Sequence, residues 1–158
     1  MPSPAGADDD RALRTLEPLS DAEIDAILPT HGIGRVVFVD ARGPVALPVN
    51  YARDHEDFVF RTESSSSVLA ASSAGRVSFE VDEIDEEHRL GWSVLATGTL
   101  HRVEDPADER HVAMLGATPW AKGPRDHHLR LVVEKITGRR LALDSDVASD
   151  GDEPVRDQ

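Results

Sequence analysis

The chain has 158 residues, no cysteine, and 30 acidic against 17 basic side chains, which give a formal net charge of −13. This length suits one domain, the missing cysteines exclude an internal disulfide framework and thiolate metal sites, and the acidic balance argues against nucleic-acid binding, which depends on Lys and Arg. Because the sequence shows neither a secretory signal nor an apolar run long enough to cross a bilayer, we expect a cytoplasmic protein that binds neither nucleic acid nor membrane.

Much of the negative charge lies at the two ends. Residues 1–10 contribute −3 and residues 144–158 contribute −5, which leaves −5 for residues 11–143. Segments rich in Asp, Pro, Ser and Gly bury too little apolar surface to offset the entropy lost on ordering. The sequence therefore predicts a disordered acidic tail over residues 1–18, one domain over residues 19–143, and a second disordered acidic tail over residues 144–158.

A helix over residues 21–28 is the first predicted element. Ser20 and Glu23 have the spacing of a capping box, and Pro29 ends the helix. Runs of β-branched and aromatic residues separated by turn sequences then predict three strands, over residues 34–40, 45–51 and 58–61.

Further helices and strands are predicted in the second half of the chain. The sequence there predicts a short helix over residues 66–74, strands over 76–82 and 92–103, a helix from Pro106 to Gly116 capped by Asp105, and a last strand over 128–141 that is broken at Gly138. Gly98 is the point where the longest strand would bulge or bend. Short strands without βαβ alternation predict a mainly β fold with short helices, a barrel rather than a Rossmann sheet.

The segment from Phe60 to Ser67 is the best candidate for a binding site. A strand ends on Arg61, and a serine-rich loop then opens the next predicted helix. The start of a helix attracts phosphate through its free N–H groups and its dipole, and an arginine adds charge-assisted hydrogen bonds. An ordinary helix cap, with Arg61 paired to a nearby acid, fits the same residues.

Other candidate residues favour structural roles. His127 and His128 are adjacent on a strand and point to opposite faces, so we interpret them as a solvated pair rather than a metal site. His31 suits a structural turn, and the acids of residues 82–87 suit a solvated loop. We identify no catalytic acid, base or nucleophile from spacing alone.

Short motifs along the chain occur in an order that is informative. They are GRVVFV at 34–39, LPVNY at 47–51, FRT at 60–62, FEVD at 79–82, GWSV at 91–94 and Gly98, followed by PW at 119–120, GPRDH at 123–127 and TGRR at 137–140. The set resembles the pyridoxamine 5′-phosphate oxidase-like family, and within it the actinobacterial flavin-binding branch, from about Leu19 to Leu141.

This resemblance implies an FMN-binding split β-barrel that forms a homodimer and holds the flavin in the groove between subunits. By the same resemblance, the backbone of Pro48, Val49 and Asn50 lines the polar edge of the flavin ring, and the ring and the ribityl phosphate lie along Phe60, Arg61 and Thr62. The phosphate is then surrounded by Ser65, Ser66 and Ser67. The residues expected to approach the flavin at the dimer interface are Trp92, Ser93, Val94 and Trp120. A buried amide such as that of Asn50 needs a partner, which either the flavin edge or neighbouring backbone would supply. Either tryptophan could equally fill the core.

The sequence departs from the family at one position. Many relatives have a lysine where this chain has Ser67, and that lysine would bind the flavin phosphate. Without it, either the affinity for the flavin phosphate is lower or another base such as Arg76 takes the place of the lysine. Alternatively, the ligand is a deazaflavin such as F420, or the site is empty. Two functions stay open: an FMN-dependent oxidoreductase that takes electrons from a donor such as NAD(P)H, and a non-catalytic module that binds flavin or F420 for storage, delivery or sensing. Pyridoxamine-phosphate oxidation is least favoured, because only Arg139 and Arg140 are left to bind a second phosphate.

Overall fold

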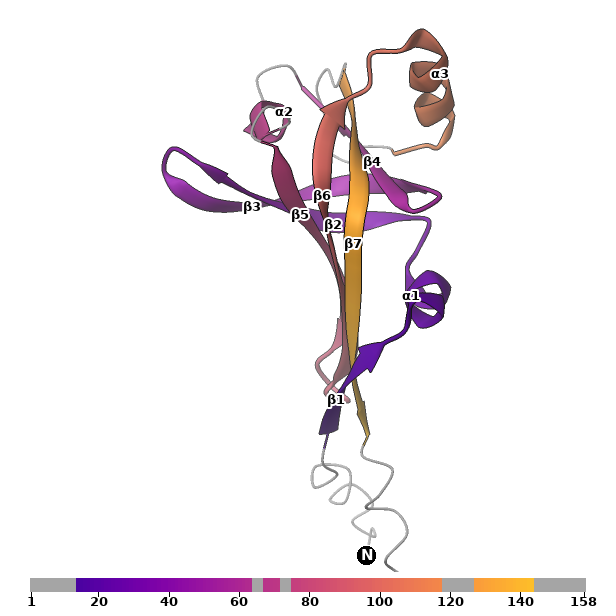
Figure 1. The fold of residues 1–158 in the computed structure, drawn as a ribbon. Helices are drawn as coiled ribbons and strands as arrows, with labels where there is room; N and C mark the ends of the chain where they lie inside the picture. The colour runs from indigo at the N-terminus through magenta and orange to yellow at the C-terminus, as the bar shows by residue number, and fades with distance from the viewer. Residues whose placement is uncertain (1–13, 64–66, 72–74, 118–126, 144–158) are drawn as a thin grey trace, which may run out of the picture.

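The computed structural model describes residues 14–63, 67–71, 75–117 and 127–143. The elements in these residues are β1 (Arg14–Leu19), α1 (Asp21–Ile27), β2 (His31–Asp40), β3 (Gly43–Asp54), β4 (Asp57–Thr62), α2 (Ser67–Ala71), β5 (Arg76–Asp85), β6 (Leu90–Arg102), α3 (Pro106–Met114) and β7 (His127–Leu143), as Figure 1 shows. The prediction of a mainly β fold with short helices is confirmed. None of the described helices is long and apolar enough to span a membrane.

The strands form one antiparallel sheet in the order β1-β7-β4-β3-β2-β5-β6. Because β6 also pairs with β7, the sheet closes on itself as a barrel. The long strands β5, β6 and β7 continue beyond the barrel and pair there with each other and with β1. We call this extension the tongue and define it as residues 14–19, 82–85, 90–93 and 139–143; it forms the narrow lower half of Figure 1.

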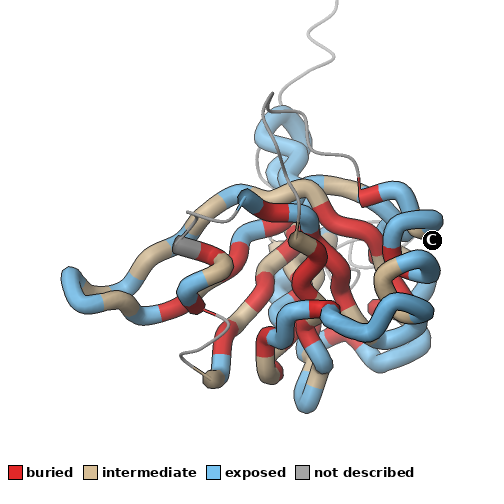
Figure 2. The backbone as a smooth tube through the Cα atoms, turned by 90° about the horizontal axis from the view of Figure 1, so that it is seen from above, coloured by how far each residue is buried: buried red, intermediate tan, exposed pale blue. Residues whose placement is uncertain are grey.

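The barrel interior is filled by four aromatic rings. Tyr51, Phe58, Phe60 and Phe79 are each almost fully buried, and the centroids of Phe58 and Phe79 lie 4.7 Å apart. Viewed from above, the barrel strands carry most of the buried positions, whereas the loops and projecting hairpins are exposed (Figure 2). Alternation along each strand directs every second side chain into this core and the others to the outer face of the barrel.

Both predicted helix caps are confirmed. The backbone N–H of Ser20 donates to Glu23 Oε2 at 2.9 Å, and the Ser20 hydroxyl accepts from the Glu23 N–H, which completes the capping box of α1. Asp105 Oδ1 accepts from the backbone N–H groups of Ala107 and Asp108 at 2.8 and 2.9 Å at the start of α3. Gly116 follows α3 with a φ of +76°, a conformation that favours glycine.

Two sequence predictions are wrong in detail. Residues 14–18, assigned to a tail, belong to β1, which pairs with the tongue end of β7. Gly138 does not break the last strand; instead, a Cβ at Gly138 would lie 2.9 Å from side-chain atoms of both Leu19 and Ile24, so the glycine makes room for α1 to pack on the strand. The expected irregularity at Gly98 is confirmed as a register shift between β6 and β7.

Candidate functional site

The predicted flavin-binding residues of β3 and β4 divide between the two faces of the barrel wall. Tyr51 pairs with Phe60 in the β3–β4 register, and both side chains fill the core. Because neighbouring side chains alternate, Asn50 and Arg61 point to the outer face. Arg61 is exposed and Asn50 is half-buried; the exposed Pro48 lies two residues before Asn50 on the same face.

Several predicted residues have side chains that a ligand outside the barrel does not reach. Phe60 packs against Phe79 with ring centroids 4.9 Å apart, and Val94 and Thr62 are also buried. Val49 is half-buried and packs against the core. These residues therefore have only their backbone groups to offer at the outer surface. Ser65, Ser66 and Trp120 lie outside the described residues, and Ser67 is the first residue of α2.

Trp92 and Ser93 lie far from this group within one chain. Both residues belong to the tongue, where Ser93 pairs with Arg139 of β7, whereas Arg61 pairs with His128 at the barrel end of the same strand. Residues 128 and 139 are eleven positions apart, which corresponds to roughly 35 Å along a strand. One chain therefore does not bring the two predicted halves of the site together.

The outer face of the sheet carries most of the large hydrophobic side chains that are exposed in the described residues. Strand registers place seven exposed aliphatic side chains on this one face: Leu16, Ile33, Val39, Ile84, Leu95, Val132 and Leu143. The other large exposed hydrophobic residue among the described positions, Met114, lies on α3. An extended apolar surface of this kind marks an interaction site on a protein.

Of the described helices, α3 packs on the outer face beside β4, whereas α1 and α2 do not cover it. α1 packs Ile24 against Gly138 on the inner side, and α2 contributes Val68 and Ala71 to the barrel core. α3 covers a small cluster around Val59, on the outer side of β4 two residues from Arg61. Within the described part of the chain, β2, β5 and β6 therefore present their outer face to solvent.

A charged group lies at the centre of the outer face. Arg35 is paired with Pro48 of β3 and with Glu80 of β5 in the sheet register. Its Nη1 donates to Glu80 Oε2 at 2.7 Å and to Asp82 Oδ1 at 3.1 Å. These two carboxylates hold the guanidinium beside the strand that carries the predicted ring-binding backbone.

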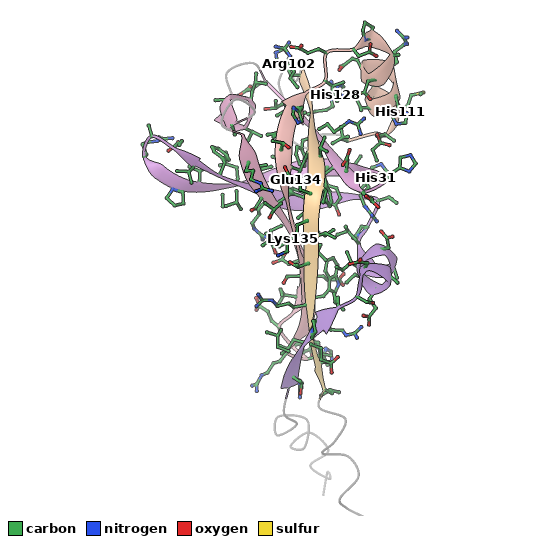
Figure 3. All side chains as sticks on the ribbon, in the orientation of Figure 1. His31, Arg102, His111, His128, Glu134 and Lys135 are labelled. Atoms are coloured by element: carbon green, nitrogen blue, oxygen red, sulfur yellow. The ribbon has the colours of Figure 1, made fainter. Side chains whose placement is uncertain are left out.

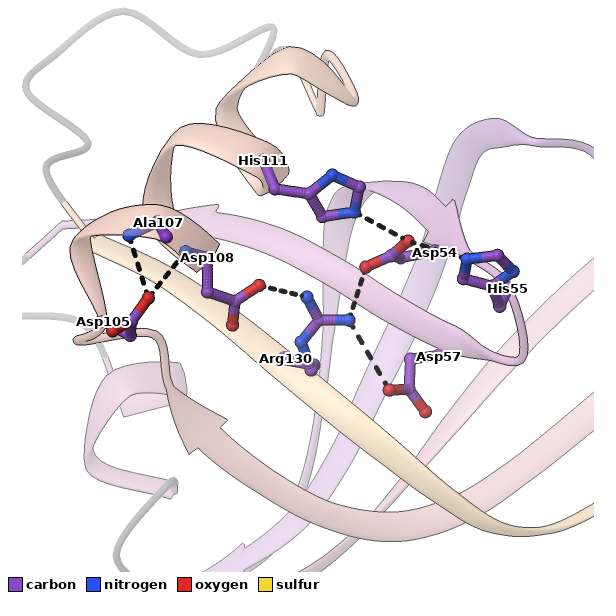
Figure 4. Close-up of polar contacts among 8 residues, drawn as sticks. All are labelled: Asp54, His55, Asp57, Asp105, Ala107, Asp108, His111 and Arg130. Carbon is purple, nitrogen blue, oxygen red and sulfur yellow. Dashed lines mark hydrogen bonds and ion pairs between the residues drawn. The ribbon is translucent and has the colours of Figure 1, made fainter.

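A partly buried ion cluster that the sequence analysis did not find joins α3 to the barrel (Figure 4). Arg130 of β7 donates to Asp54 Oδ2 at 2.6 Å and to Asp108 Oδ1 of α3 at 2.7 Å, and its Nη1 lies 3.6 Å from Asp57. Burial alone would raise the pKa of Asp54, but hydrogen bonds from His111 and Arg130 outweigh that effect and hold this pKa below its usual value. The sequence holds no local signal for the cluster, because its members come from β3, β4, α3 and β7.

Histidine side chains also make contacts at α3. His128 is buried and its Nδ1 lies 2.5 Å from Glu109 Oε1, so the prediction of a solvated histidine pair is wrong for this residue. His31 contacts the carbonyl of Leu115 at the end of α3, in keeping with its expected structural role. Figure 3 labels His111 on α3 itself, His31 on β2 and His128 on β7.

Arg76, the base expected to compensate for a missing lysine, has an acidic partner. Its Nη2 forms an ion pair with Glu134 of β7, and Thr99 Oγ1 donates to the other oxygen of the same carboxylate at 3.1 Å. Two partners therefore occupy the Glu134 carboxylate, and the Arg76 guanidinium is engaged at the barrel wall.

Comparisons with known proteins agree with this architecture. The pyridoxamine 5′-phosphate oxidase family model matches residues 20–140. The uncharacterized protein Rv0080 of Mycobacterium tuberculosis is 32% identical over 140 residues, which are 85% of this chain and 91% of that protein. An FAD binding protein from Mycobacterium smegmatis superposes with a TM-score of 0.67 at 28% identity, covering 80% of this chain and 99% of its own. An FAD-binding protein from Mesorhizobium loti shares the fold with a TM-score of 0.68 at 22% identity, over 82% of this chain and 99% of its own. The chain therefore belongs to the pyridoxamine 5′-phosphate oxidase family and has its split-barrel fold.

Proposed function

We propose that this protein binds a flavin nucleotide on the outer face of its barrel, in a groove that a second copy of the chain completes, and that it acts there as a flavin-dependent oxidoreductase. The observation that carries the proposal is the uncovered outer face, with Asn50 and Arg61 at its barrel end and Ser93 at its tongue end. The M. smegmatis relative that matches over nearly its whole length is an FAD binding protein, which supports a flavin ligand here.

The barrel end suits the flavin ring and its phosphate. Arg61 is an exposed cation at the end of β4, two residues before the segment that leads into α2. A guanidinium there would hold the phosphate through charge-assisted hydrogen bonds. The backbone of Pro48 and the amide of Asn50, on the same face, would contact the polar edge of the ring.

A second subunit is needed because the tongue of the same chain is too distant. An isologous dimer would place the tongue of each subunit against the barrel of the other, so that Ser93 approaches the partner's flavin, whereas Trp92 points to the opposite face and packs against the core cluster. Such pairing would also cover the seven aliphatic side chains of the outer face, and depletion of charge with enrichment in apolar residues is typical of dimer interfaces.

The flavin would supply the redox chemistry when bound. The chain's own part would be to bind the ring, to orient it and to exclude water by dimerisation. A non-catalytic carrier of flavin or F420 would use the same surface. The reason to test this second function is Ser67, which stands where many relatives have a lysine.

The proposal is tested on the full-length protein. We expect yellow protein, or uptake of added FMN or FAD at micromolar concentration, and a dimer mass by light scattering. Bleaching of the bound flavin by NADH or NADPH would support the oxidoreductase, whereas binding without bleaching would support the carrier. A colourless monomer that takes up neither flavin would refute both.

A further inference from the structure

A cavity of about 380 Å³ lies between α1, the β3–β4 turn and β7. This volume lies in the range of small-molecule sites. The cavity is separate from the proposed flavin groove. Arg53, which lines it, follows the buried Tyr51 by two residues and so points to the inner side of β3, whereas Asn50 points to the outer side. Asp57, beside the β3–β4 turn, and Arg61 lie at opposite ends of β4, roughly 13 Å apart.

Direct contacts hold the three walls of the cavity in place. The Nη2 of Arg53 donates to Asp25 Oδ1 at 2.7 Å, which ties β3 to α1. The backbone N–H of Val133 donates to Asp57 Oδ1 at 3.1 Å, which ties β7 to the start of β4. α1 packs closely on β7 at Gly138. A ligand would therefore enter a preformed site, and preformed sites lower the ordering cost of binding.

The lining has an apolar part and a charged part. Its apolar side chains also pack against the barrel core; they are Ile24, Val133 and Ile136. The described residues contribute four carboxylates to the lining, and two of these are already paired. Asp25 binds Arg53. Glu134 binds Arg76. The chemistry offered to a ligand is therefore set by the apolar side chains and by the charges that remain.

Three charged side chains of the cavity have no partner within the described part of the chain. They are two carboxylates, Asp21 and Glu56, and one ammonium, Lys135. The Nε–H of Arg53 is also buried without a hydrogen-bond acceptor among these residues. A buried donor left unpaired lowers stability, and a carboxylate oxygen in the cavity would satisfy it. The complementary ligand carries two cationic groups, one carboxylate and an aliphatic stem for the apolar side chains.

We propose that this cavity binds a diamino acid of the lysine type. Its two ammonium groups bind Asp21 and Glu56, and its carboxylate binds Lys135. Its methylene stem covers Ile24 and Ile136. Such a ligand gives each of the three charges a partner, whereas a fatty acid, a simple amine or an apolar molecule leaves at least one of them without one. The site goes beyond the proposed function and does not depend on flavin binding.

Calorimetric titration of the full-length protein with L-lysine tests this assignment, and three analogues that each lack one group are the comparison. Cadaverine lacks the carboxylate, ε-aminocaproate lacks the α-ammonium and L-norleucine lacks the side-chain ammonium. We expect L-lysine to bind at millimolar concentration or below, and each analogue to bind about fivefold more weakly or worse, because one charged contact is lost. This series uses the unmodified protein, so its result does not depend on how well a variant folds.

Two variants separate the charged contacts. Lys135→Gln is expected to weaken L-lysine by about fivefold and to leave cadaverine unchanged or strengthen it, because cadaverine has no carboxylate. Glu56→Gln is expected to weaken both ligands, since both carry two cations. The matched controls, Arg42→Gln and Glu104→Gln, each remove one exposed charge of the same sign outside the cavity and leave both affinities unchanged. A lack of L-lysine binding, cadaverine binding as tightly as L-lysine, or equal weakening of the two ligands by Lys135→Gln would overturn the assignment.

Discussion

Arg130 Nη1 lies 2.6 Å from Asp54 Oδ2, and this contact joins β7 to the end of β3. Asp54 is 8% exposed and Arg130 17% exposed, so water screens the pair weakly. The same guanidinium binds Asp108 of α3, which makes Arg130 the shared partner of a strand end and a helix. α3 is therefore held on the barrel by charge as well as by its one buried side chain, Val112.

Removing this guanidinium is expected to destabilise the protein. Arg130→Gln leaves the Asp54 carboxylate buried without its cation, and we expect the free energy of unfolding to fall by about 2–3 kcal/mol. Chemical denaturation measures the change. Arg42→Gln breaks an ion pair in which the arginine is 85% exposed, and its expected effect is below about 0.5 kcal/mol. Equal effects of the two substitutions would contradict a stabilising role for the cluster.

Acid is expected to weaken the fold partly through Asp54. The pKa of this carboxyl is lowered in the folded state, so its contribution to stability is present above the unfolded-state pKa, about 3.9, and is lost as the pH falls through the folded pKa. We expect the free energy of unfolding to decrease progressively below about pH 5. Asp54→Asn is expected to flatten this decrease. Denaturation midpoints measured across the acid range check it, and parallel curves for the two proteins would count against the assignment.

Tyr51 provides a probe of the barrel interior, because it is the only tyrosine in the chain. Burial raises the pKa of Tyr51 to about 12, and its hydroxyl donates to the Pro29 carbonyl at 3.1 Å. Stability linked to this group is present below the unfolded-state pKa, about 10, and is lost as the pH rises through the folded value. Ultraviolet titration is expected to show tyrosinate only near pH 12 or on unfolding. Ionisation near pH 10 in folded protein would show that the ring is solvated.

The two glycines of the β6–β7 region are expected to differ in their tolerance to alanine. A Cβ at Gly98 would collide with the Val132 carbonyl of the paired strand, so Gly98→Ala forces a backbone shift and is expected to cost about 2–3 kcal/mol. At Gly138 the nearest atoms belong to the side chains of Leu19 and Ile24, which can move, and the expected cost of Gly138→Ala is smaller. Thermal unfolding ranks the two variants; the reverse order would contradict this account of the bulge.

Arg61 is expected to distinguish between flavins by their phosphate. Arg61→Ala should weaken FMN by roughly tenfold or more, because a charge-assisted hydrogen bond is lost, and riboflavin by less than about twofold. Fluorescence titration of both flavins measures the ratio. Arg102→Ala, which removes an exposed arginine at the end of β6, controls for general loss of positive charge. Equal weakening of FMN and riboflavin would remove Arg61 from the phosphate site.

Local features of the fold could be predicted from the sequence because their causes are local. The capping box of Ser20 and Glu23, the cap at Asp105 and the bulge at Gly98 all depend on a few neighbouring residues. Strand β1 was missed because its sequence, with Pro18 inside it, has no clear alternation, and only pairing with β7 makes it a strand.

The parts that sequence could not supply depend on distant contacts. His128 belongs to a polar segment, and only the packing of α3 brings Glu109 to it and buries it. Gly138 was predicted to break the last strand, but the structure shows that glycine is needed there because α1 approaches the strand closely. For the candidate site, the sequence indicated Arg61 and Ser93. Only the strand registers show that the two residues pair with distant positions of β7, Arg61 with His128 and Ser93 with Arg139.

Strand β7 has a consequence for how the protein is made. It pairs with β1, β4 and β6, so it closes both the barrel and the tongue, and it is the last described element of the chain. While residues 14–102 leave the ribosome, the edges of β4 and β6 have no partner and much of the core is uncovered, a state that favours aggregation. The barrel cannot close before β7 is available, and a chain truncated before residue 127 lacks the strand that pairs with β1, β4 and β6.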